Sequence, residues 1–167
     1  MQIALYDASI AAFLRGLNNL DAFLAQAQAY AEKKQFDAGN LLVARLAPDM
    51  LPFTKQVQIA CDSARFSAGR LSGAEVPSHP DDETTLEQLR ERIGKTVAFL
   101  EGLDKTLFDG PEKTIEMKFK GQTATFTSQD YLLQFALPNF YFHVTTAYAI
   151  LRHNGVALGK MQYLGFA

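Results

Sequence analysis

A run of twenty-one residues without formal charge, from Tyr131 to Leu151, constrains this chain more than any other feature. A helix that lacks charge on every face is typical of a helix buried on every face. We therefore expect this segment at the centre of the molecule, partly in the core and partly in a subunit interface. The run is about long enough to cross a bilayer, but Gln134, Asn139 and His143 would be costly in lipid, so we expect no membrane span.

Composition places the chain among ordinary globular domains. Its 167 residues are 48% hydrophobic and 20% charged, which favours one domain over residues 1–167 with a sizeable core. The net charge of -2 offers no basic surface for nucleic acid. Cys61 is the only cysteine and the N-terminus lacks a secretory pattern, so we expect a cytoplasmic protein.

Apolar residues at steps of three and four predict the first two long helices. The first step pattern runs from Ile3 to Ala31, and the cations Lys33 and Lys34 suit a helix C-terminus. A short helical turn is expected over Leu41–Leu46. The second helix is predicted to start with Asp49 as its cap and Pro52 in its first turn, and to end near Leu71.

A loop over Leu71–Asp82 separates these from a third helix that begins at Thr84 or Thr85, with Thr84 and Glu87 as a capping box. Apolar residues then alternate with polar ones from Ile115 to Phe126, which predicts a short β-hairpin turning at Gly121-Gln122.

The fourth helix follows the hairpin. Thr127 or Ser128 is expected to cap it, Asn154-Gly155 to end it, and Pro138 to kink it. The sum predicts a mainly α-helical protein, a four-helix bundle with a hairpin between its third and fourth helices.

His143 is the best single candidate for chemistry. It shares a helical face with Phe140 and Ala147, which we expect to point into the bundle, where a polar ring must find a partner. Two interpretations stay open: a structural histidine bonded to a side chain or carbonyl, or a metal ligand or acid–base group. His153 lies about 15 Å further along the helix, too far to share an ion, and His79 is expected to be exposed in its loop.

Other signatures of chemistry are missing from the sequence. No glutamate precedes a histidine by three residues, as bundle metal sites favour. There is no glycine-rich phosphate loop, no nucleophile elbow and no Cys-x-x-Cys. The thirteen phenylalanines and six tyrosines could line an apolar pocket, but they more often form core.

The chain resembles an uncharacterised bacterial domain family over nearly its whole length, most clearly in its C-terminal part. The resemblance rests on Leu137–Arg152, Asn154-Gly155-Val156 and Leu158-Gly159-Lys160, and on Pro48-Asp49-Met50, Pro52-Phe53, Gln56-Val57 and Arg70-Leu71-Ser72-Gly73. That family is similar to the DinB/YfiT-like superfamily of four-helix bundles. The resemblance implies a DinB-like bundle, and, because many superfamily members bind a divalent metal and dimerise, a metal site and a homodimer are expectations as well.

The superfamily's metal site uses three histidines, one on the second helix and two in a His-x-x-x-His on the fourth. His143 matches the first of that pair, the second position is Ala147, and the second helix contains no histidine. Two of three ligands are therefore absent, whereas zinc ordinarily takes three or four protein ligands. A site rebuilt with Gln56, Asp49 or Asp62 is the remaining way to hold a divalent metal.

Three hypotheses follow. In the first, the bundle has lost its metal and binds a small molecule or partner, with His143, Gln56 and Tyr148 lining a candidate pocket. In the second, it is a divergent enzyme of the thiol or small-group transferase type that uses a divalent metal on His143. In the third, it is a structural homodimer with the fourth helix as its seam. We favour the first.

Overall fold

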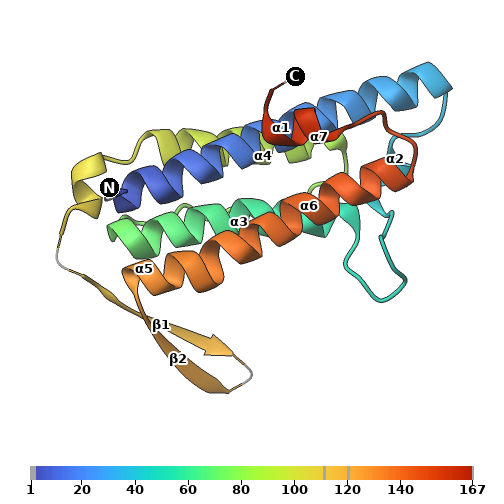
Figure 1. Ribbon diagram of the computed structural model, residues 1–167. Coiled ribbons are helices and arrows are strands. Elements are labelled where there is room, and N and C mark those ends of the chain that lie inside the picture. Colours follow the sequence, from blue (N-terminus) through green and yellow to red (C-terminus); the bar gives the residue numbers. More distant parts are fainter. Residues whose placement is uncertain (1–2, 111, 120, 167) are drawn as a thin grey trace.

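Four long helices lie side by side in the computed structural model, which describes residues 3–110, 112–119 and 121–166 (Figure 1). They are α1 (Leu5–Lys34), α3 (Phe53–Ser72), α4 (Leu86–Glu101) and α6 (Leu137–His153). Both α1 and α3 pack against α4 and α6, so the four helices enclose one core. This arrangement confirms the predicted bundle.

Shorter elements lie at the ends of the bundle, except α7 (Lys160–Leu164), which packs against the middle of α1 (Figure 1). The others are α2 (Gly39–Leu42), the 3-10 turn η1 (Lys105–Phe108), the strands β1 (Thr114–Phe119) and β2 (Gln122–Thr127), α5 (Ser128–Tyr131) and the π-helical turn η2 (Leu132–Ala136).

The apolar stripe of α1 forms one wall of the core. Its predicted steps from Ile10 to Ala31 are buried, with Ile10, Leu17 and Leu24 fully enclosed. The stripe was wrong at its first member, because Ile3 precedes the helix and is 69% exposed. The helix ends at Lys34. The next residue, Gln35, has a left-handed backbone conformation, and its N–H donates to the carbonyls of Ala31 and Glu32 in the last turn.

Small residues bring α6 close to its neighbours. Ala60, Ala64 and Ser67 form a buried small stripe on α3, the helix that α6 contacts most. On the other side, the ring of Phe140 lies directly over Gly16 of α1, where a Cβ atom would sit 2.5 Å from it. Because neither helix has bulk at these points, α6 settles between α1 and α3.

The start of α6 shows how the chain accommodates Pro138. Thr127 caps the preceding turn by accepting a hydrogen bond from the Asp130 backbone N–H at 3.1 Å. The helix then widens into η2 immediately before Pro138, which lies in the first turn of α6. Proline has no N–H, so one helical hydrogen bond is missing at Pro138. The chain forms a π-helical turn just before this residue, at the place where a kink was predicted.

The hairpin projects from the end of the bundle beside α5 (Figure 1). Its register pairs Ile115 with Phe126 and Met117 with Ala124, so the predicted apolar residues share one face. Gly121 supplies the positive φ of 85° that the turn requires. Lys120, expected on the polar face, lies outside the described residues.

The connection from α3 to α4, residues 73–85, runs back along α3 and is held by buried arginines. We call it the strap. Arg65, on α3, donates to the carbonyl of Pro77, and Arg92, on α4, donates to the carbonyl of Pro80 at 3.0 Å. Because the strap runs back along α3, the helices α3 and α4 run in the same direction, and the loop predicted over Leu71–Asp82 forms most of this connection.

Carboxylates neutralise Arg92 where it is buried. Asp62 and Glu83 accept from it at 2.7 and 2.9 Å, and Asp81 lies 3.0 Å away. Burial alone would raise the pKa of Glu83, but the hydrogen bonds from Arg92 and Gln58 hold it below its ordinary value. The cluster thus fixes the strap with paired charges, as a buried guanidinium requires.

Three helix starts differ from the sequence prediction. The turn expected over Leu41–Leu46 is α2, four residues long and earlier, because the Asp37 carboxylate accepts from the Gly39 N–H and starts it there. Asp49 caps nothing: α3 begins after Pro52, which is its extended N-cap residue. The capping box belongs to Thr85 and Gln88, one position later than Thr84 and Glu87.

The uncharged run is not buried on every face. Leu133, Tyr141 and Phe142 are 53%, 39% and 54% exposed. The reason is geometric, because a helix that packs mainly on two neighbours leaves its outer side uncovered. No helix among the described residues is long and apolar enough to cross a lipid bilayer.

Two glycine substitutions test the close approach of α1 and α6. Gly16→Ala should lower the free energy of unfolding by about 1–3 kcal/mol, because its methyl group would overlap the Phe140 ring. Gly94→Ala, in the open on α4, should raise it by about 0.5–1 kcal/mol through helix propensity. Urea unfolding measures the free energy of unfolding of both variants. The same change in both would contradict the close contact of Gly16 with Phe140.

Candidate functional site

His143 points into the bundle, as its position on α6 predicted. It follows Phe140 by one turn, and both side chains face the core, with His143 only 8% exposed. Ala147, one turn further on, is fully buried on the same side. The imidazole therefore lies at the interface between α6 and α3.

Gln56 of α3 is the partner of the imidazole. Its Oε1 lies 2.7 Å from His143 Nδ1, and its Nε2 donates to the carbonyl of Leu51 at 3.0 Å. Because the amide N–H₂ serves Leu51, its oxygen faces the ring, so Nδ1 carries the proton and donates. The Nε2 atom of His143 then holds the lone pair, is free of hydrogen bonds to the described residues, and is not fully enclosed.

The surroundings keep this imidazole neutral. Burial lowers the pKa of His143 below its ordinary 6.5. Its neighbour Phe142 presents an edge to the ring with centroids 5.1 Å apart, which adds apolar surface without charge. A neutral imidazole with one nitrogen anchored is able to accept a proton or hydrogen bond at the other.

The residues present do not fit a three-ligand metal site. The position one turn after His143 holds the methyl group of Ala147, and Gln56 is already bonded at both ends. Asp62 is committed to Arg65 and Arg92, and Asp49 is exposed. Within the described ranges no three His, Cys, Asp or Glu side chains gather as a metal cluster would need.

Tyr148 does not join His143 and Gln56. Its ring packs against Phe23 of α1 and Tyr163 of α7, with centroids 5.7 and 5.6 Å away. Five residues along a helix turn a side chain by about 140°, so it faces a different side of α6. The structure therefore brings together two of the three predicted pocket residues.

The other reactive side chains lie apart from this pair. Cys61 is fully buried, which raises the pKa of its thiol to about 12 and leaves it a poor nucleophile. His79, in the strap, is half-buried and not exposed as predicted, and burial lowers its pKa. His153 is exposed at the end of α6.

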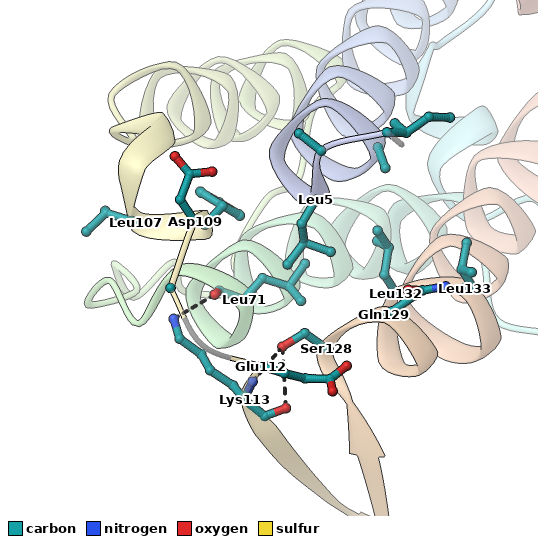
Figure 2. Close-up of a pocket in the computed structure, with 15 residues that line it drawn as sticks. Leu5, Leu71, Leu107, Asp109, Glu112, Lys113, Ser128, Gln129, Leu132 and Leu133 are labelled. Carbon is teal, nitrogen blue, oxygen red and sulfur yellow. Dashed lines mark hydrogen bonds between the residues drawn. The ribbon is translucent and has the colours of Figure 1, made fainter. Parts of the chain in front are cut away.

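A pocket of about 840 Å³ opens at the end of the bundle where the hairpin joins (Figure 2). We call it the end pocket. Its wall at Leu132 lies roughly 16 Å from His143 along the helix axis, since Leu132 precedes that residue by eleven helical positions. Its apolar lining comes mainly from Leu5, Leu71, Leu107, Phe108, Leu132 and Leu133.

Polar groups stand at the edge of the end pocket. Lys113 donates through Nζ to the Leu71 carbonyl at 2.7 Å, in the last turn of α3, where a cation is favoured. Asp109, Glu112 and Gln129 also line it. Sequence reasoning missed this site, because its walls come from α1, α3, η1 and η2 and no local pattern connects them.

Comparisons with known proteins agree with this architecture. A family model described as "Domain of unknown function (DUF1993)" matches residues 5–164. A crystal structure of a DinB family member from Shewanella denitrificans is 44% identical with a TM-score of 0.89, over 96% of this chain and 92% of that one. None of the curated proteins matches the chain.

The buried imidazole makes stability depend on pH. Because the folded state lowers the pKa of His143, the unfolded chain binds more protons as pH falls through about 6.5, so stability present above that pH is lost below it. His143→Leu should cost about 1–3 kcal/mol at pH 7.5 by leaving Gln56 unpaired, and should flatten the loss between pH 7.5 and 5.

Urea unfolding across this pH range measures both effects. His153→Leu is the matched control, because that ring is exposed and its removal should leave the pH dependence unchanged. A pH profile of His143→Leu parallel to that of the wild type would contradict the assignment.

Proposed function

Since the chain belongs to the DUF1993 family and shares the DinB-like bundle, we propose that it is a binding protein that works without a resident metal. The observation that carries this proposal is a chain of two hydrogen bonds, from the His143 ring to the Gln56 amide and from that amide to the Leu51 carbonyl. The Gln56 amide, bonded at both ends, stands beside the imidazole, and Ala147, at the second position of the superfamily's helix-four pair, offers only a methyl group.

A small-molecule role is supported by the end pocket. Pockets of about 300–1,000 Å³ with apolar walls and a few polar groups are typical of small-molecule sites. The end pocket has this size and lining, and it is built from the ends of several helices. We therefore propose that a small molecule binds in the end pocket and not at the position where the superfamily holds its metal.

A divergent metal-dependent enzyme, of the thiol or small-group transferase type, is the second candidate. The observation in its favour is the free Nε2 atom of His143, because histidine ligands usually anchor their other nitrogen to an acceptor as Nδ1 does here. Against it stands the shortage of further ligands nearby.

Metal binding separates the two candidates. Tag-free protein prepared without chelator should contain no stoichiometric metal by elemental mass spectrometry, and should show no tight site when titrated with zinc, nickel or manganese, since one imidazole is a weak ligand set. One ion per chain, lost in His143→Ala and kept in His153→Ala, would sink the metal-free proposal and favour the enzyme.

A homodimer is the partner that we propose. Its support is the outer side of α6, where Tyr141 and Phe142 are 39% and 54% exposed, apolar surface that a second copy would cover. We also propose a cytoplasmic location, because the lone buried cysteine suits a reducing compartment.

Light scattering at micromolar concentration tests the dimer. The wild type should elute as a dimer and Phe142→Glu as a monomer, because a charge would be buried in the seam. Ala98→Glu, on the exposed side of α4, should stay dimeric. A monomeric wild type would remove the proposal.

A further inference from the structure

We infer that the end pocket binds an organic cation with an apolar body, a hydrophobic amine; this rests on the proposed small-molecule role and gives that role a ligand class. The inference is drawn from three features of the pocket: grouped apolar side chains, unpaired carboxylates and a cation that is already bonded.

The apolar part of the argument is the grouping of exposed side chains. Ile3, Leu107 and Leu133 are 69%, 42% and 53% exposed, and all three line this one pocket. Single exposed apolar residues are ordinary, but a group around a hollow marks a binding surface. Buried Leu71 and Leu132 form part of its wall, so an alkyl or aromatic body would contact apolar surface on several sides.

The charged part is the pair of carboxylates at the edge. Figure 2 draws Asp109 beside η1 and Glu112 near Ser128. Neither carboxylate has a hydrogen bond or ion pair with the described residues, whereas Asp7 on the nearby turn of α1 is paired with Lys105 at 3.0 Å. Lys113, the one cation among the described lining residues, is bonded to the Leu71 carbonyl. The described lining residues therefore carry a net charge of -1 (Asp109, Glu112 and Lys113), and both carboxylates are free of partners among them.

A helix terminus is the main argument for an anion, and it is the weaker one. The N-terminus of α1 reaches the pocket at Ala4 and Leu5. However, a helix N-terminus carries only a partial charge, and Asp7 and Lys105 beside it neutralise each other. Two full carboxylate charges outweigh this partial charge, so the charges at the pocket favour a cation.

Calorimetric titration with three probes of one chain length tests the inference: octylamine, octan-1-ol and octanoate, at pH 7 and low salt. Octylamine should bind one per chain, about tenfold tighter than octan-1-ol, and octanoate should bind most weakly. The preference for the amine should shrink in 0.5 M sodium chloride, because salt screens exposed charges.

Variants locate the charge. The double variant Asp109→Asn, Glu112→Gln should bring octylamine to the affinity of octan-1-ol and leave octan-1-ol unchanged. Glu116→Gln, an exposed acid on the hairpin that does not line the pocket, should change neither.

The outcomes separate the ligand class from the proposed function. Equal binding of all three probes, reduced by none of the variants, would overturn the amine and keep a small-molecule role. Tighter binding of octanoate would also overturn it and assign the pocket to anions. Binding of no probe would overturn both the site and the small-molecule role, while the metal titration would still decide whether the bundle is metal-free.

Discussion

Close packing of α6 against both α1 and α3 sets the geometry of this bundle. Phe140 can lie on α1 only because Gly16 offers no side chain there, and α3, the helix that α6 contacts most, carries the small buried residues Ala60 and Ala64. This contact fixes the rotation of α6 about its axis. Once Phe140 faces inward, His143 must follow it one turn later, and the need for a partner at Gln56 arises from that rotation.

The energetics of the imidazole explain why this pair is closed. A buried polar group without a partner costs about 1–3 kcal/mol, whereas a satisfied hydrogen bond contributes only about 1 kcal/mol net. The main effect of Gln56 is therefore to remove a penalty and to keep the ring neutral with its proton on Nδ1. The buried formal charge lies elsewhere, on Arg92. Three carboxylates neutralise its guanidinium and hold the strap.

The end pocket exists because several chain breaks coincide at one end of the bundle. α1 begins there, α3 ends there, η1 follows α4, and η2 widens the helix before Pro138. Helix ends cannot pack as tightly as helix sides, so a hollow remains where they meet. Leu132, in the wall of this hollow, precedes His143 by eleven helical positions, so the imidazole lies several turns away along the bundle.

Local patterns in the sequence were enough for most of the architecture. The steps of α1 from Ile10 to Ala31, the alternation of Ile115, Met117 and Phe126, and the break at Pro138 each follow from a period or a missing N–H that acts over a few residues. Exact helix starts were less well predicted, since Thr84 and Thr85 both offer a hydroxyl, and in the folded protein it is the Thr85 hydroxyl that accepts from the Gln88 N–H.

The candidate site was also predictable from the sequence only in part. The sequence by itself determined that His143 faces inward, which follows from helical spacing, and that Ala147 cannot ligate, because its methyl group carries no donor atom. Only the tertiary structure decided that Gln56 meets the ring, that Tyr148 turns toward Phe23, and that Asp109 and Glu112 flank an apolar hollow. Those contacts join residues dozens of positions apart, and their formation depends on how the helices are rotated and offset, which no local period encodes.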